Sequence, residues 1–256
     1  MDVSRLAVLS ATGLTSAALA GVGLLVVEAA LTIRRGFLSP DTAPAQDGLI
    51  GDPSRPTLRL AMLGDSTAAG VGVSRAQHTV GRQLAVRLAR DGRCIHLSAS
   101  AVAGSRVSDL GPQVSRALLG QPDVAVVLVG ANDATHGTRL ETVSHHLRDA
   151  VGRMRAAHVP VVVGTCPDLG SAPAWSQPLR GVIGWRAHQV AQVQRAATTA
   201  AGGVCVDIGA ATGAIFRADR GTFSEDGFHP SADGYRLWAE ALLPAVADAT
   251  SAPATL

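Results

Sequence analysis

The sequence predicts an α/β fold in which helices cross over a five-stranded parallel sheet. Short apolar runs alternate along the chain with longer segments, and in those segments apolar residues recur at every third or fourth position, as in Val80, Leu84 and Leu88. Alternation of this kind is typical of parallel strands that are joined by crossover helices. An apolar amino-terminal run precedes this pattern, and a proline-rich stretch connects the two parts.

These patterns divide the chain into four parts. We expect a transmembrane anchor or signal segment over residues 1–35, a proline-rich linker over 36–56, a single domain over 57–249 and a flexible tail over 250–256. The chain has 256 residues, 47% of them hydrophobic, which is enough for one domain with a substantial core.

The amino-terminal run extends from Leu6 to Ile33 and is interrupted only by Glu28. It exceeds the ~20 residues that a membrane-spanning helix needs. A small-residue cleavage site exists at 18–20, but the apolar run continues past it, which favours an uncleaved anchor. Arg34 and Arg35 follow the run, so the charge bias does not favour export. We expect a membrane-associated protein of the cell envelope with its domain outside; secretion after signal cleavage is the alternative.

The remaining elements follow in order. Prolines at positions 40, 44, 53 and 56 disfavour both helix and strand in the linker. Five buried strands are expected over 58–63, 94–98, 124–129, 159–164 and 204–208. Between them we expect helices over 77–91, 107–119, 139–158 and 178–201, and a closing helix over 231–247.

The composition excludes several functional classes. With 22 basic and 20 acidic residues and no long basic run, the chain is not expected to bind nucleic acid. Every basic residue is arginine, which excludes a Schiff base, a Ser-Lys dyad and a Walker-type phosphate loop. The cysteines Cys94, Cys166 and Cys205 lack CxxC spacing and are expected to be structural thiols. We expect neither a metal nor an organic cofactor.

Three candidate site residues follow successive strands. Ser66 comes after the first strand, Gly104 after the second and Asn132 after the third. Because ligands bind beyond the carboxyl ends of strands in open parallel sheets, we expect these residues to meet at one edge. Ser66 is the nucleophile candidate; the alternative is that it only caps a helix. Asn132 and Gly104 offer N–H donors to an oxyanion, although a turn residue and a loop glycine would look the same.

A base and its supporting carboxylate stand near the carboxyl end. Asp226 precedes His229 by three positions across Gly227, so one turn lets the carboxylate face one ring nitrogen while the other faces Ser66. The structural alternative is that Asp226 and Ser231 cap the closing helix and leave His229 exposed. Together these residues indicate a serine hydrolase.

Four sequence blocks between residues 58 and 243 resemble those of the SGNH, or GDSL-type, hydrolases: Gly64-Asp65-Ser66, Gly104, Gly130-Ala131-Asn132-Asp133 and Asp226-Gly227-Phe228-His229-Pro230. The overall sequence is similar to actinobacterial envelope members of the family. The resemblance implies a flavodoxin-like α/β/α sandwich, no cofactor or metal, and hydrolysis of esters, thioesters or acetylated sugars. It also implies that Ser66 is the nucleophile, that Asp226 supports His229, and that Ser66, Gly104 and Asn132 form the oxyanion hole.

The sequence departs from the family pattern at two places. Thr67 stands where the family name has leucine, which makes a lipase-like activity less secure than an esterase activity. In the second block, which ends at Gly104, a serine stands near the place where many relatives have asparagine.

The expected function is that of a serine esterase acting on a small-molecule ester or an acylated lipid or glycan. An acyl-enzyme on Ser66 would be hydrolysed by water that His229 activates, so activity should rise with pH as His229 becomes neutral. An acyl- or acetyltransferase or a deacetylase of cell-envelope glycans or lipids would use the same acyl-enzyme. An ordinary α/β-hydrolase is disfavoured because Ser66 lacks the GxSxG elbow.

The alternative of a different class is a non-catalytic binding module on the same fold, for example one that holds a nucleotide at the glycine-rich loop 64–72. It is disfavoured because Arg75 stands where GxGxxG requires a third glycine. The substrate pocket is not evident in the sequence. Its conspicuous large apolar residues serve equally well as a pocket wall or as packing anchors: Trp175, Trp185, Phe223 and Phe228.

Overall fold

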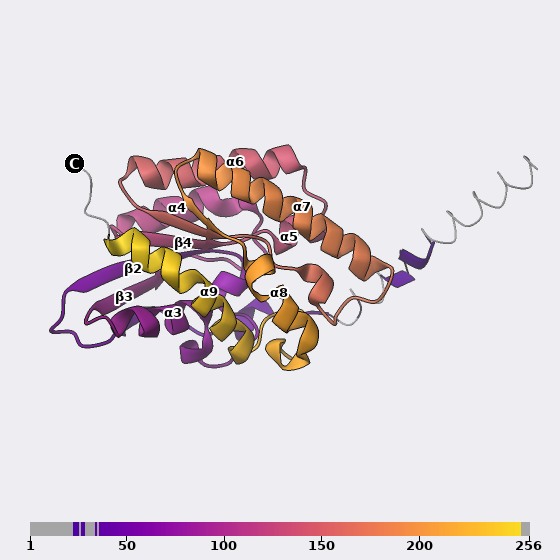
Figure 1. Cartoon of the computed structure of the whole chain (residues 1–256), viewed down its shortest axis with the longest axis horizontal. Helices are drawn as coiled ribbons and strands as arrows, with labels where there is room; N and C mark the ends of the chain where they lie inside the picture. Colours follow the sequence, from indigo (N-terminus) through magenta and orange to yellow (C-terminus); the bar gives the residue numbers. More distant parts are fainter. Residues whose placement is uncertain (1–22, 26, 29–33, 35, 252–256) are drawn as a thin grey trace, which may run out of the picture.

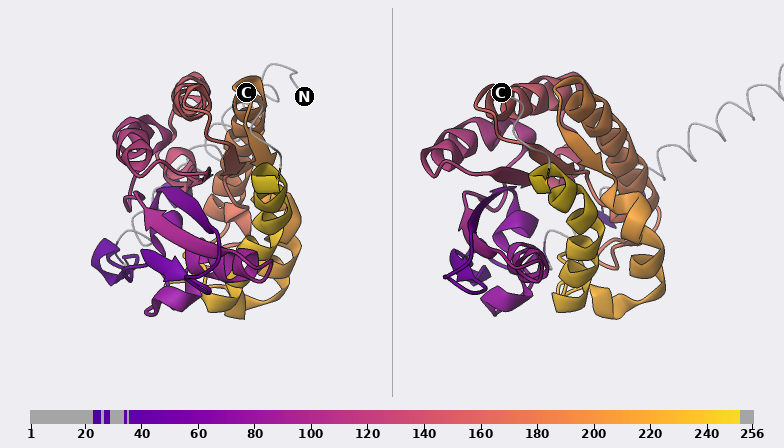
Figure 2. Two further views of the ribbon diagram at one scale, coloured as in Figure 1. Left: turned by 90° about the vertical axis from the view of Figure 1, so that its left-hand side faces the viewer. Right: turned by 60° about the vertical axis from the view of Figure 1, so that its left-hand side comes forward.

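The computed structural model describes residues 23–25, 27–28, 34 and 36–251. It has three layers, with helices on both faces of one mostly parallel sheet (Figure 1). Helices α4 (Leu110–Leu119), α6 (Leu140–Ala156) and α7 (Leu179–Ala200) cover one face, and α3 (Val80–Ala89), α8 (Ile208–Ala218) and α9 (Ala232–Ser251) cover the other (Figures 1 and 2). The predicted α/β class is confirmed.

The sheet has the strand order β1-β3-β2-β4-β5-β6. Its strands are β1 (Gly48–Ile50), β2 (Thr57–Gly64), β3 (Cys94–Ala99), β4 (Val124–Leu128), β5 (Val161–Gly164) and β6 (Val204–Val206). Strand β1 runs antiparallel to β3, and the other neighbours are parallel. Because β2 pairs with both β3 and β4, the winding direction reverses at β2, and a crevice opens beyond its carboxyl end.

The prediction of five buried strands is wrong in two respects. The sheet has one strand more than expected, β1, and it lies in the segment 36–56 that we expected to be a linker. Three residues suffice for it because it extends an existing edge: Asp47 accepts the N–H of Ala99 at 2.7 Å, and the buried Gln46 donates to the carbonyl of Ala68 at 2.7 Å. The last expected strand is present as β6, but it lies at the other edge of the sheet, where Val204 is 46% exposed.

The predicted crossover helices and the closing helix appear as α3, α4, α6, α7 and α9. Their apolar stripes face the sheet, as for Val143, Leu147 and Val151 in α6, which are buried. The structure adds α8 and two short helices, α2 (Ser66–Ala69) and α5 (Ala131–Thr135). The described part of the chain also contains single 3₁₀ turns: Pro40–Thr42, Ala76–His78, Val107–Asp109, Leu169–Ser171 and Arg220–Thr222.

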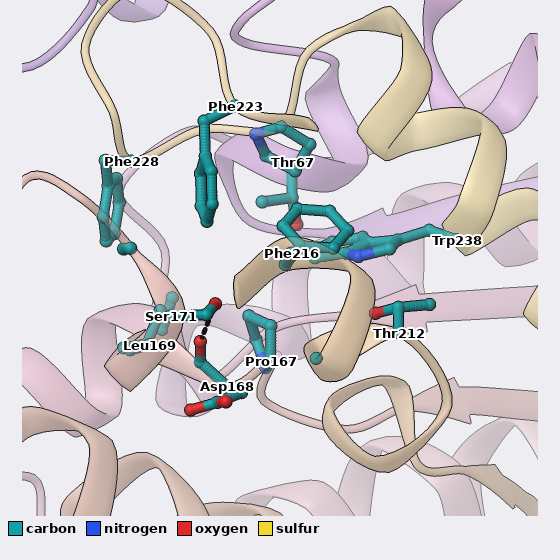
Figure 3. Close-up of a pocket in the computed structure, with 14 residues that line it drawn as sticks. Thr67, Pro167, Asp168, Leu169, Ser171, Thr212, Phe216, Phe223, Phe228 and Trp238 are labelled. Carbon is teal, nitrogen blue, oxygen red and sulfur yellow. Dashed lines mark hydrogen bonds between the residues drawn. The ribbon is translucent and has the colours of Figure 1, made fainter. Parts of the chain in front are cut away.

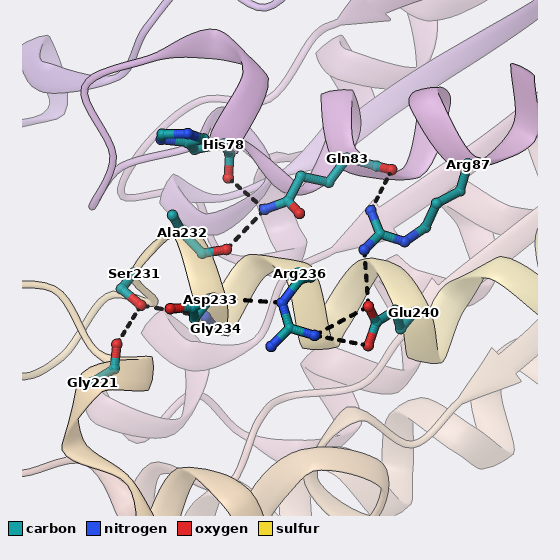
Figure 4. Close-up of polar contacts among 10 residues, drawn as sticks. All are labelled: His78, Gln83, Arg87, Gly221, Ser231, Ala232, Asp233, Gly234, Arg236 and Glu240. Atoms are coloured by element: carbon teal, nitrogen blue, oxygen red, sulfur yellow. Dashed lines mark hydrogen bonds and ion pairs between the residues drawn. The ribbon is translucent and has the colours of Figure 1, made fainter.

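Polar contacts join α3 to α9 on the outer face of the domain (Figure 4). The Gln83 side chain donates to the carbonyl of Ala232, the first residue of α9, at 2.8 Å, and to that of His78 at 3.1 Å. One helical turn further on, Arg87 pairs with Glu240 at 2.9 Å. These contacts hold the amino-terminal end of α9, which begins three residues after His229.

The predicted membrane segment lies largely outside the described residues. No helix within the described part is both long enough and apolar enough to cross a bilayer. Glu28, the acidic residue that interrupts the apolar run, is described: its carboxylate accepts the N–H of Leu179 at 2.9 Å, at the first residue of α7. Helix α9 ends at Ser251, and residues 252–256 of the predicted tail lie outside the described part.

Candidate active site

The turn after β2 places Ser66 at the start of α2. Gly64 has φ +134°, and a Cβ atom there would lie 1.7 Å from the carbonyl oxygen of Leu128, so only glycine lets β2 end this close to β4. Asp65 then caps α2: its carboxylate accepts the backbone N–H of Thr67 at 2.9 Å and the Thr67 hydroxyl at 2.8 Å. The turn therefore fixes the backbone of Ser66 at the crevice.

The structure brings Ser66, His229 and Asp226 together in a hydrogen-bonded series. The Nε2 atom of His229 lies 3.0 Å from Oγ of Ser66, and its Nδ1 lies 2.6 Å from Oδ2 of Asp226. His229 is 4% exposed, so it does not project into solvent as the structural alternative requires. Gly227, with φ +65°, allows the turn that folds Asp226 back against the ring.

A set of donors surrounds the Asp226 carboxylate. Its Oδ1 accepts the backbone N–H groups of Phe228 and His229, each at 2.9 Å, and the Ser224 hydroxyl at 2.8 Å. Burial would raise the pKa of Asp226, but hydrogen bonds from the His229 ring and from these two N–H groups outweigh it and hold the pKa below its usual range. Asp226 is thus an anion at neutral pH and keeps the proton of His229 on Nδ1.

Gly104 and Asn132 line the same cleft as Ser66 and His229, a space of about 170 Å³. At Gly104, φ is +84° and no atom lies within 4 Å of the position a Cβ would take, so its surroundings are open. The Asn132 amide nitrogen donates to the carbonyl of Ser105 at 3.0 Å. This nitrogen carries two hydrogens, and the second one remains for a ligand in the cleft.

Two buried glutamines support these loops, and the sequence analysis did not identify them. On α4, Gln113 accepts the N–H of Gly64 at 2.8 Å and donates to its carbonyl at 3.0 Å. On α7, Gln194 accepts the N–H of Cys166 at 2.6 Å and donates to the carbonyl of Val129 at 2.8 Å. A polar residue within the buried stripe of a helix is the signal that could have revealed them.

The segment predicted as a linker also reaches the site. Phe37, Leu38 and Pro40 line the cleft, and the N–H of Leu38 donates to Oδ2 of Asp226 at 3.2 Å. Nothing in the sequence indicates this contact, because Leu38 and Asp226 are 188 positions apart.

Figure 3 shows a second, mostly apolar cavity, which Phe228 and Pro230 line on either side of His229 in the sequence. Phe216, Phe223 and Trp238 line it, and Phe228 lines both this cavity and the cleft. Trp175 is buried against Phe228 and is a packing anchor, whereas Trp185 is 62% exposed; neither lines the cleft. Within the described residues, no three His, Cys, Asp or Glu side chains are grouped so that they could hold a metal ion.

Comparison with known proteins agrees with this architecture. Residues 62–237 match the model of the GDSL-like Lipase/Acylhydrolase family. The GDSL-like esterase Rv1075c of Mycobacterium tuberculosis is 38% identical over 223 residues, which cover 82% of this chain and 71% of that protein.

Solved structures share the fold at low sequence identity. The lipase/acylhydrolase from Enterococcus faecalis superposes with a TM-score of 0.59 at 18% identity, covering 78% of this chain and 99% of that one. A lipolytic G-D-S-L family protein from Veillonella parvula superposes with a TM-score of 0.60 at 16% identity, covering 73% and 97%. With its family model matched from residue 62 to residue 237 and its polar side chains gathered at the end of β2, the chain belongs to the GDSL-like lipase/acylhydrolase family of ester hydrolases.

Proposed function

We propose that this protein is a serine esterase that cleaves carboxylic esters through an acyl-enzyme on Ser66. The observation that carries the proposal is the hydrogen-bonded series from Ser66 through His229 to an ionised Asp226. A serine hydroxyl is a weak nucleophile unless a base takes its proton, and an imidazole in this position meets that need.

In the acylation step, Oγ of Ser66 attacks the ester carbonyl carbon while Nε2 of His229 takes the hydroxyl proton. The electron pair of the carbonyl π bond moves to oxygen, and Asp226 stabilises the imidazolium that forms. The intermediate then collapses: the carbon–oxygen bond to the alcohol breaks, and His229 returns the proton to the leaving oxygen. Water, activated by the same ring, attacks the acyl-enzyme and releases the acid together with free Ser66.

Three donors are available for the oxyanion. The backbone N–H of Ser66 opens α2, where the first N–H groups have no partner within the helix. Gly104 contributes a backbone N–H, and Asn132 contributes the free hydrogen of its amide. Donors fixed in place before the reaction stabilise the developing charge without reorganisation, which is the main source of rate enhancement in sites of this kind.

The full chain should hydrolyse p-nitrophenyl acetate and butyrate, and Ser66→Ala should lower kcat by about 10⁴-fold or more, because the nucleophile is gone. Ser144→Ala is the matched control, since Ser144 lies on α6 and lines no part of the cleft. Circular dichroism establishes that all three proteins are folded. An equally active S66A variant would contradict the assignment, and an inactive wild type would contradict the proposed activity.

We also propose that the apolar amino-terminal run anchors the protein in a membrane of the cell envelope. The support is the length of this apolar run, which exceeds what a bilayer crossing needs. After cell fractionation, the full chain should stay in the membrane pellet through an alkaline carbonate wash. Release by that wash would contradict anchoring, and a shortened chain in the medium would indicate a cleaved signal.

A further inference from the structure

The cleft has a wall that lies outside the part of the chain matched by the family model. That match begins at residue 62, whereas Phe37, Leu38 and Pro40 line the cleft together with Ser66 and His229. The family model therefore does not cover this wall.

Several contacts hold the wall in place. The Phe37 ring packs on Phe228 with a centroid distance of 4.7 Å and on Trp175 at 5.8 Å. These two partners lie in different loops, one before α9 and one after β5, and they contact each other in an edge-to-face arrangement at 5.8 Å. The hydrogen bond from Leu38 to Asp226 fixes the adjoining backbone. The Phe37 ring is thus held against the site by two fixed aromatic residues.

The free face of this wall is apolar. Phe37 remains 41% exposed although it is a large apolar side chain that lines the cleft. Val71, Ala103 and Phe228 continue the apolar lining, and His229 is the only ionisable residue among the described residues of the cleft. An exposed apolar surface in a cleft gains free energy when an apolar ligand group covers it.

The position of the ring indicates which part of an ester it meets. Phe228 packs edge-to-face on the His229 ring at 5.1 Å, and Phe37 lies against the same Phe228. In the proposed acylation step the leaving oxygen must lie at Nε2 of His229, which protonates it. The carbonyl oxygen must instead face the donors at Gly104 and Asn132. Phe37 is joined through Phe228 to the His229 side of the cleft, which is the side where the alcohol departs.

We propose that Phe37 is a specificity-determining residue that contacts the alcohol group of the ester, so that the cleft selects esters of apolar alcohols. This inference rests on the proposed esterase function. It assigns a role to a residue that precedes the family-matched part of the chain.

Two ester series test the proposal in the full chain, with kcat/KM measured by titration of the released acid. The first series is ethyl, butyl and hexyl acetate, in which only the alcohol changes. The second is ethyl acetate, butanoate and hexanoate, in which only the acyl group changes. Because kcat/KM reports the acylation step, slow hydrolysis of the acyl-enzyme does not mask a preference for the alcohol.

Phe37→Ala should lower the hexyl-to-ethyl acetate ratio of kcat/KM by about tenfold, the size expected when an apolar pocket loses several carbon contacts. The ratio within the acyl series should stay within about twofold. Phe37→Leu, which keeps an apolar side chain, should give an intermediate alcohol ratio. Leu119→Ala is the matched control, because Leu119 is an 86% exposed apolar residue at the end of α4.

The remaining outcomes are distinct. An unchanged alcohol ratio in folded F37A, or a uniform loss across both series, would overturn the specificity role while leaving the esterase function in place. A change confined to the acyl series would overturn the assignment to the alcohol side. A wild type that hydrolyses no ester would contradict the proposed function itself, and this inference with it.

Discussion

Asp65 places a carboxylate in the protein interior directly before the candidate nucleophile. The residue is 1% exposed, and burial raises its pKa from 3.8 to about 6, against the opposing effect of its hydrogen bonds from Thr67. These bonds also shape the turn that presents Ser66. The fold therefore accepts the cost of a buried charge at neutral pH in order to hold this turn.

This cost predicts a pH dependence of stability. Because the pKa of Asp65 is higher in the folded state than in the unfolded state, the contribution of Asp65 to the free energy of unfolding is greatest below about pH 4 and falls as pH rises through 6. Asp65→Asn removes this dependence. The free energy of unfolding of D65N relative to the wild type should rise by about 2 kcal/mol between pH 4 and pH 7.

Urea unfolding at each pH measures this difference. Asp91→Asn is the control, since Asp91 is exposed and its variant should track the wild type across the range. A difference between D65N and the wild type that does not change with pH would show that burial does not raise the pKa of Asp65.

Residue contacts differ in how far the sequence can predict them. Asp226 and His229 are three positions apart, so turn geometry alone suggested their pairing. Leu38 and Asp226 are separated by 188 positions, and the aromatic contacts of Phe37 also depend on the finished tertiary fold. The catalytic candidates could therefore be named from the sequence, whereas the wall opposite them could not.

At the level of elements, Gln113 joins α4 to the turn that follows β2. Its amide forms two hydrogen bonds with Gly64, two positions before Ser66, and a third with the Ser105 hydroxyl at 3.1 Å. The backbone carbonyl of Ser105 in turn accepts an N–H of the Asn132 side-chain amide. One buried side chain thus links the loops after β2 and β3, and through Ser105 the start of α5.

Gln113→Leu should lower the free energy of unfolding by roughly 1–3 kcal/mol, because the buried N–H of Gly64 loses its partner. It should also lower kcat by roughly tenfold, because the loops that carry Ser66 and Gly104 lose a common anchor. Denaturant unfolding and ester hydrolysis measure the two effects. Gln192→Leu is the control, since Gln192 is exposed on α7. A Q113L protein as stable and active as this control would contradict the role.

Long elements were predictable because they repeat a pattern over several turns. The buried stripes of α3 and α6 repeat over two turns or more, and the central strands are buried on both faces. The three-residue strand β1 is too short to show a periodicity, and its formation depends on the free edge of β3. Helix α8 follows β6 directly, with Asp207 as its cap, so the strand expected over 204–208 includes the first residue of this helix, Ile208.

Across the whole molecule, two hydrophobic cores meet at the sheet. Residues of β2 contribute to both: Ala61 and Leu63 face one core, and Leu60 and Met62 face the other. The reversal of winding at β2 opens the crevice where strands from both halves end. The candidate site therefore lies, as predicted, beyond the carboxyl ends of the parallel strands. The segment 36–56 packs onto the same domain.

The position of Phe37 in the cleft wall limits how far the cleft can lie from the apolar amino-terminal run. Only four peptide links separate Ile33, the last residue of the apolar run, from Phe37, and a chain of that length spans at most about 14 Å. If a membrane binds Ile33, the mouth of the cleft therefore lies within about 14 Å of that membrane. For an ester dissolved in that membrane, the short connecting chain keeps the cleft at a high local concentration of substrate. The rate of turnover would then depend on the density of the ester in the membrane.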